Sequence, residues 1–140
     1  MSGKISAPRW LASVLVSALV GTGLALTSAA PAAAGNFNGK CESGEVCLWY
    51  QYNFSGPSAD FYDAVSNYTA WHFYNSSYWL NDNTRSAKAN TWITCPYLFE
   101  HANYGGRLII MTKSEWMTSL NNGNVDLNDK VSSHDFRFCK

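Results

Sequence analysis

Charged side chains are scarce in this chain of 140 residues, and no basic stripe is present. They make up 14% of the sequence, with ten Lys and Arg residues against ten Asp and Glu residues. Once Lys4 and Arg9 are set aside as part of a leader segment, eight basic residues face ten acidic ones. The remaining chain then carries a charge of about −2, so nucleic acid is not an expected partner.

Long apolar runs are also missing, except near the N-terminus. Lys4 and Arg9 precede an apolar run at residues 10–26, and a small-x-small cleavage pattern follows. This pattern predicts a secretory signal peptide at 1–34 and a secreted, extracellular domain at 35–140. A membrane anchor is the alternative, but Ser, Thr and Gly residues interrupt the run. After cleavage we expect about one hundred residues in a single domain, as a monomer without membrane contact.

No Cys-x-x-Cys spacing is present, which argues against a zinc site of four thiolates. The four cysteines all lie in the expected mature chain, and an even number in a small exported domain predicts two disulfides. We favour the pairing of Cys41 with Cys47 and of Cys95 with Cys139, because it staples each half of the chain separately. The sequence leaves the two other pairings open.

Motifs for catalysis are absent as well. No Gly-x-Ser-x-Gly or His-Glu-x-x-His segment is present, and the three histidines are scattered. His134 and Asp135 are adjacent on an expected strand, where neighbouring side chains point to opposite faces. The same argument applies to Glu100 and His101. The sequence therefore predicts a protein that is not an enzyme.

Helical periodicity is hard to find after the leader, whereas short apolar or aromatic runs recur between clusters of Gly, Asn, Asp and Ser. Such runs are typical of strands. The segment 114–120 is long enough for one or two helical turns with Ser114 as the cap. The expected strands lie at 46–52, 59–62, 87–93, 97–100, 107–111 and 135–138.

The chain contains one unit written twice, about fifty positions apart. Each copy has the spacing aromatic-x(4)-aromatic-x-Gly, followed by an Asn-Asp segment at 80–86 or 127–133. Motif one covers about 41–92 and motif two about 93–140. Four strands in each motif predict an all-β, two-sheet Greek-key sandwich. The residues that carry the first spacing are Trp49, Phe54 and Gly56 in one copy and Phe99, Tyr104 and Gly106 in the other.

The paired spacing, with Asn/Asp-Asn/Asp-x-x-Ser/Thr-Ser in each half, resembles the signature of the βγ-crystallin fold over essentially the whole mature chain. The Cys-x(5)-Cys-Leu-Trp segment at 41–49, together with the hairpin segment at 101–106, resembles exported bacterial members of peptidase inhibitor family I36. This resemblance implies a disulfide-stapled sandwich of two tandem four-stranded motifs. It also implies that the protein inhibits a peptidase.

The crystallin resemblance further implies a calcium site in the second motif. There Asn128 and Asp129 would supply oxygen atoms, Ser132 would bind through its hydroxyl, and Ser133 would bond the hairpin. In the first motif Arg85 replaces the hydroxyl, so we expect one calcium site at most, with the first ion lost or replaced by an ion pair of Arg85. The alternative is that the segment serves only as a turn and hairpin latch.

The segment 71–79 has five aromatic residues in nine positions and no charge. Such density suits either a binding face or a core. Trp71, Phe73 and Tyr74 are candidate partner-binding residues, whereas Trp79 is an expected core residue.

The resemblance to family I36, together with the predicted export, implies a secreted, non-enzymatic inhibitor that blocks an extracellular metallo- or serine protease with a rigid loop. The candidate loops are 66–77 and 120–126, and no residue is assigned to a reactive bond. Two alternatives stay open: a calcium-binding extracellular module, and a killer-toxin-like antimicrobial protein.

Overall fold

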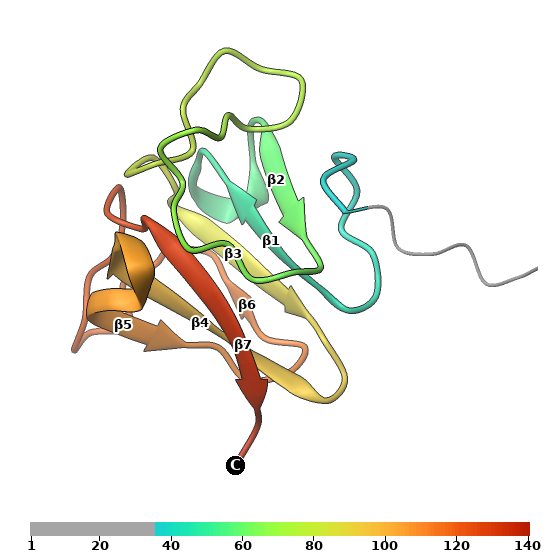
Figure 1. The fold of residues 1–140 in the computed structure, drawn as a ribbon, viewed down its shortest axis with the longest axis vertical. Helices are drawn as coiled ribbons and strands as arrows, with labels where there is room; N and C mark the ends of the chain where they lie inside the picture. Colours follow the sequence, from blue (N-terminus) through green and yellow to red (C-terminus); the bar gives the residue numbers. More distant parts are fainter. Residues whose placement is uncertain (1–35) are drawn as a thin grey trace, which may run out of the picture.

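The computed structural model describes residues 36–140, so the signal peptide predicted at 1–34 lies outside the described residues. Within 36–140 the chain forms two antiparallel sheets, two short 3-10 turns and no α-helix (Figure 1). The first sheet has the strand order β2-β1-β3-β6 and the second the order β5-β4-β7. This architecture confirms the two-sheet β-sandwich predicted from the sequence.

The strands of the first sheet are β1 (Glu45–Trp49), β2 (Ser58–Phe61), β3 (Ser86–Asn90) and β6 (Trp116–Met117). Those of the second sheet are β4 (Thr94–His101), β5 (Gly105–Ile110) and β7 (Ser133–Phe138). The 3-10 turns are η1 (Tyr52–Phe54), between β1 and β2, and η2 (Ala102–Tyr104), between β4 and β5. The β3–β4 turn and the C-terminus lie toward one end of the molecule, away from the long β2–β3 connection (Figure 1).

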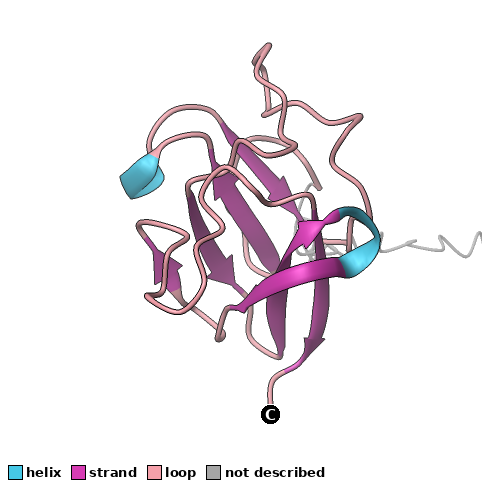
Figure 2. Cartoon of the chain, turned by 90° about the vertical axis from the view of Figure 1, so that its left-hand side faces the viewer, coloured by secondary structure: helices cyan, strands magenta, loops and turns pink. Residues whose placement is uncertain are grey.

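The core lies between the two sheets, because alternate residues along the strands are apolar and face inward. Val46 of β1, Phe61 of β2 and Leu98 of β4 are fully buried in it. The β2–β3 connection adds Tyr68 and Phe73 to the same cluster. Figure 2 shows the two sets of strands from the side, with long irregular connections running over their ends.

Each motif contributes an element to the sheet of the other motif. Strand β6 of motif two pairs with β3 of motif one, with Met117 opposite Ala87. In return, Val65 of motif one forms an antiparallel bridge with His134 in β7. Since each sheet is completed from the other motif, the core belongs to the pair of motifs and to neither alone.

The prediction of helical turns at 114–120 is wrong. Ser114 has a positive φ of 61°, whereas a helix cap has an extended backbone. Residues 116–117 form β6, and Ala89 of β3 donates its backbone N–H to the Glu115 carbonyl at 2.8 Å. Pairing with a sheet edge satisfies these backbone groups, which overrides the weak local preference for a helix.

Each motif contains one disulfide. Cys41 is bonded to Cys47, six positions away, and Cys95 to Cys139, 44 positions away. This is the pairing that the sequence favoured. The second bond ties the start of β4 to the end of the chain beyond β7. The described residues contain no helix with the length and hydropathy needed to span a membrane.

Candidate functional site

The two folded hairpins of the repeat have nearly the same geometry. In motif one the rings of Trp49 and Phe54 are 5.4 Å apart, and in motif two those of Phe99 and Tyr104 are 5.7 Å apart. Gly106 has a φ of +79°, and a Cβ there would lie 2.7 Å from the His101 ring. A side chain at this position would therefore clash as well as strain the backbone.

A buried serine latches each hairpin. The Ser86 hydroxyl donates to the Gln51 carbonyl at 2.6 Å and accepts from the Phe54 N–H at 3.0 Å. In motif two the Ser133 hydroxyl donates to the His101 carbonyl at 2.7 Å and accepts a 3.2 Å bond from the N–H of Tyr104. Each latch satisfies two backbone groups at the fold of a hairpin.

In the second half a hydroxyl and a carboxylate from different motifs meet. The Ser132 hydroxyl donates to Asp82 Oδ1 at 2.9 Å, although the two residues are fifty positions apart. They line a shallow cleft of about 340 Å³. Its other lining residues are Glu100, His101, Asp129 and Lys130.

In the first half the corresponding place holds an ion pair. Arg85 Nε donates to Asp129 Oδ2 at 2.9 Å, and the guanidinium lies over the rings of Tyr50 and Tyr52, 5.3 and 5.8 Å from their centroids. The hydrogen bond to Asp129 raises the pKa of Arg85. The cation at this place is thus a side chain of the protein itself.

The three predicted calcium ligands do not point to one centre. Asn128 is turned toward the preceding loop, where its Oδ1 accepts from the Leu120 N–H at 2.9 Å and its Nδ2 donates to the Ser119 hydroxyl at 3.0 Å. Asp129 binds Arg85, and Ser132 binds Asp82. Of the three, only Asp129 and Ser132 line the cleft.

The two halves of the molecule would offer a hard cation different groups. Asp82 and Ser132 offer the oxygen ligands that calcium prefers. Glu100 also lines the cleft, but it is bonded by Arg107 at 2.6 and 2.9 Å, which lowers the pKa of Glu100 to about 2. No group of three His, Cys, Asp or Glu side chains suited to a metal occurs within 36–140. Hydroxyl and carbonyl oxygens would therefore have to complete any shell.

The aromatic segment proves to be a small hairpin with an inner and an outer face. Leu80 donates its N–H to the Trp71 carbonyl, and Phe73 donates to that of Tyr78. Phe73 is buried in the core at 1% exposure, so its assignment as a partner-binding residue is wrong. The alternation of a hairpin, invisible in the composition, turns this side chain inward.

The outer face of the same hairpin overturns a second expectation. Trp79 is 52% exposed and lies against His72, with ring centroids 3.8 Å apart, so it is not a core residue. Trp71 is half-buried against the rings of Phe37 and Phe61. Of the three proposed partner-binding residues, only Tyr74 is well exposed.

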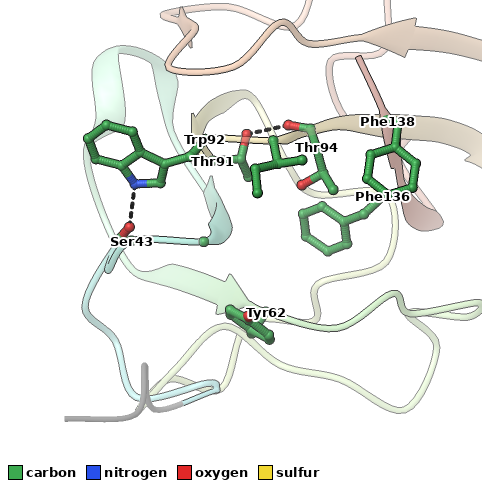
Figure 3. A pocket seen from close by; sticks show the side chains of 9 residues that line it. Ser43, Tyr62, Thr91, Trp92, Thr94, Phe136 and Phe138 are labelled. Atoms are coloured by element: carbon green, nitrogen blue, oxygen red, sulfur yellow. Dashed lines mark hydrogen bonds between the residues drawn. The ribbon is translucent and has the colours of Figure 1, made fainter. Parts of the chain in front are cut away.

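At the opposite end of the molecule, the β3–β4 turn presents an uncharged hollow of about 420 Å³ (Figure 3). In Figure 3 Trp92 and Ser43 lie on one side of it, Phe136 and Phe138 on the other, and Tyr62 across from the turn. Trp92 donates its ring N–H to the Ser43 hydroxyl. The remaining lining residues are Gly44, Thr91, Ile93 and Thr94.

The sequence model of peptidase inhibitor family I36 matches residues 32–111, more than half of the chain. The chain belongs to this family. Membership of an inhibitor family, together with the crystallin fold, favours a binding protein over an enzyme. No curated protein matches the chain.

Solved structures similar to this I36 protein are βγ-crystallin domains and their relatives. One, solved for a study of the evolution of the eye-lens βγ-crystallin domain fold, is 28% identical, covers 77% of this chain and 95% of its own, and has a TM-score of 0.58. Spherulin 3a from Physarum polycephalum is 26% identical over 73% of this chain and 90% of its own, at a TM-score of 0.52. A βγ-crystallin from Ciona intestinalis, 16% identical over 67% of this chain and its whole length, has a TM-score of 0.55 and supports the fold alone.

The β3–β4 turn of this I36 protein was not predicted, because the apolar residues of 87–93 are typical of a single strand. The strand ends at Asn90, and Trp92 and Ile93 are 75% and 68% exposed. The signal was present in the sequence: an Asn-Thr pair precedes the two large apolar residues, and Thr94 and Cys95 begin the next strand.

Proposed function

We propose that this I36 protein is an exported inhibitor of an extracellular peptidase and acts by tight, non-covalent binding. The observation that carries the proposal is the family match over residues 32–111. No residue is assigned to chemistry on a substrate.

The rigidity of the domain supports this proposal. A protein inhibitor binds tightly when its contact surface loses little conformational freedom on binding. Here two disulfides and two buried serine latches hold the ends and the hairpins. In addition, each sheet is completed by the other motif. Such a frame presents its connecting loops in fixed conformations.

Titration of the exported, disulfide-bonded protein against a peptidase panel tests the proposal. The panel contains a thermolysin-like metalloprotease and a subtilisin-like serine protease, each assayed with a small peptide substrate. We expect stoichiometric inhibition of one of them at micromolar protein or below. Protein with both disulfides reduced and alkylated is the control and should lose the inhibition. If the intact protein inhibits no member of the panel, the proposal fails.

We also propose a calcium site in the second half, for which the contact between Ser132 and Asp82 is the specific support. Asp82 and Ser132 would hold the ion, with hairpin carbonyls completing the shell, and the ion would link the two motifs. The first half does not fit calcium, because the Arg85 guanidinium stands against Asp129. Bound calcium would add stability and would not take part in inhibition.

Thermal unfolding with calcium and with a chelator tests this second proposal. For a site with a Kd of about 10 μM, about 1 mM calcium should add roughly 2.7 kcal/mol to the free energy of unfolding, which is several degrees in Tm. In each of two matched variants, one residue is replaced by its equivalent from the other motif. Ser132→Arg should abolish the shift in Tm, and Arg85→Ser should keep it. A wild-type Tm that is the same in calcium and chelator would rule the site out.

A further inference from the structure

Three large apolar side chains gather at the disulfide-bonded end of the molecule and are more exposed than their neighbours. Trp92 is 75% exposed, Ile93 68% and Phe138 78%. They lie on the β3–β4 turn and at the end of β7, around the hollow of Figure 3. Exposed apolar residues that cluster in this way mark interaction sites, whereas single ones need no explanation.

The other exposed tryptophans of the described chain each have an aromatic or cationic partner within the protein. Trp116, 60% exposed, has the Lys88 ammonium 4.2 Å from its ring centroid and Phe54 against its edge. Trp79 lies against His72. Within 36–140 the rings of Trp92 and Phe138 have no aromatic or cationic partner. These two rings and the Ile93 side chain are therefore free to contact another molecule.

The turn that carries Trp92 and Ile93 is tied to its surroundings by hydrogen bonds and disulfides. Thr91 donates its hydroxyl to the Thr94 carbonyl across the turn, and Trp92 is bonded to Ser43. Ser43 lies within the short loop closed by the Cys41–Cys47 disulfide. On the other side, the Cys95–Cys139 disulfide fixes the residues that follow the turn and those that follow Phe138. Both disulfides thus support the same surface.

None of the nine residues around the hollow carries a charge. A partner that matches this surface must offer an uncharged, apolar recess, because a charged group buried against it would lose its hydration without compensation. Exposed apolar side chains at the edge of the hollow, on a backbone that is already hydrogen-bonded, are suited to fill such a recess. A peptidase with an apolar specificity pocket has this chemistry.

We infer that the β3–β4 turn, with Ile93 and Trp92 as anchors and Phe138 beside them, is the surface that contacts the inhibited peptidase through its apolar specificity pocket. This inference rests on the proposed function as an inhibitor. It replaces the loops 66–77 and 120–126 as the candidate contact. In the first of these loops Phe73 is in the core. The second is closed on itself by a bridge between Asn121 and Asp126.

Substitutions at matched exposed positions test the inference on the full disulfide-bonded protein. Ile93→Ser, Trp92→Ser and Phe138→Ser alter the surface, while Trp116→Ser and Trp79→Ser are controls of similar exposure elsewhere. The inhibition constant is measured against the peptidase that the wild-type protein inhibits. We expect an increase of at least about 30-fold for Ile93→Ser or Trp92→Ser and less than about threefold for either control. The Ile93 side chain makes no polar contact, so its variant separates loss of contact from loss of turn structure.

The outcomes separate this inference from the proposed function. If the wild-type protein inhibits no peptidase, the proposed function fails and this inference fails with it. If it inhibits and the three variants inhibit equally well, the inference alone is overturned. Sedimentation of the protein alone tests whether a second copy of this chain binds the surface instead of a peptidase. A dimer that Ile93→Ser dissociates without weakening inhibition would also overturn the inference. Thermal unfolding of every variant verifies that each is folded.

Discussion

Arg85 of the first motif reaches Asp129 of the second at 2.9 Å, whereas Ser132 of the second motif reaches Asp82 of the first at 2.9 Å. Arg85 and Ser132 occupy the same position in the repeat, as do the two aspartates. The backbone around them is alike, since Asp82 and Asp129 both have a φ close to 55°. The two motifs therefore share a backbone conformation at this position, while the side chain that links them to each other differs.

A second difference lies beneath these links. In the second half the Tyr68 hydroxyl bonds His134 Nδ1 at 2.6 Å, and His134 Nε2 bonds the Asp63 carbonyl at 2.9 Å. Since a carbonyl only accepts, Nε2 carries the proton and Nδ1 accepts from Tyr68. In the first half the corresponding residues are Leu120 and Ala87, which are buried and apolar. At these positions the second half therefore contains a titratable histidine and the first half does not.

Removal of each disulfide in turn should give the largest difference between the two halves. Chain entropy predicts a loss of about 4 kcal/mol for Cys95→Ala/Cys139→Ala, which opens the 44-residue separation, and about 2 kcal/mol for Cys41→Ala/Cys47→Ala. Urea unfolding at pH 7 measures both. Equal losses would mean that the unfolded chain does not follow the loop-length relation.

Acid should destabilise the whole domain through the histidine that is buried in the second half. Burial lowers the pKa of His134 to about 4, while the unfolded value is near 6.5. The unfolded chain therefore takes up a proton in this window that the folded chain refuses, so the free energy of unfolding falls as the pH drops from 6.5 to 4. The loss is on the order of 3 kcal/mol, and the stability is fully present above pH 6.5.

The control for this acid effect replaces Tyr68 and His134 by the apolar residue types that occupy the corresponding positions of the first half. The free energy of unfolding of the double variant Tyr68→Leu/His134→Ala should depend less steeply on pH between 6.5 and 4 than that of the wild type, whatever its stability at pH 7. Urea midpoints at several pH values give the slope. A slope in the double variant equal to that of the wild type would assign the acid effect to other groups.

The two serine latches should be equivalent. Ser86→Ala and Ser133→Ala each leave a buried hairpin carbonyl and N–H without a partner, so each should cost about 2 kcal/mol. Urea unfolding of the two variants at pH 7 measures the costs. A large difference between them would show that one motif contributes more to the stability of the pair than the other.

The ion pair of the first half should have the smallest effect. Arg85 and Asp129 are 31% and 39% exposed, so Arg85→Gln should lower the free energy of unfolding by less than about 1 kcal/mol. The difference should shrink further in 0.5 M salt, as exposed charges are screened. Lys130→Gln, which removes the exposed pair with Asp126, is the control. A loss of several kcal/mol would mean that Arg85 holds the motifs together as a bound ion would.

Much of the fold was accessible from the sequence because its signals are local. The spacing of Phe54 from Gly56 predicted a folded hairpin, and the serine after each Asn-Asp segment predicted its latch. Both rest on contacts within one motif. The helical turns predicted at 114–120 are absent, because residues 116–117 pair with β3 of the other motif. The strand predicted at 87–93 ends early, at Asn90, because the chain turns there toward β4.

The candidate site was less accessible for the same reason. A ligand set made of Asn128, Asp129 and Ser132 assumes that neighbours in sequence are neighbours in space. The structure instead sets Ser132 against Asp82 and Asp129 against Arg85, each across the two motifs. Likewise, composition could not tell that Phe73 faces inward and Trp79 outward.

The sequence by itself determined the duplication, the β class, the hairpins and the residues that latch them, because turn residues and alternating apolar positions act over a few residues of chain. Only the tertiary structure decided which motif completes which sheet, which carboxylate meets which partner, and which aromatic rings remain exposed. Those outcomes depend on contacts between segments fifty residues apart, whose packing removes the most apolar surface from water.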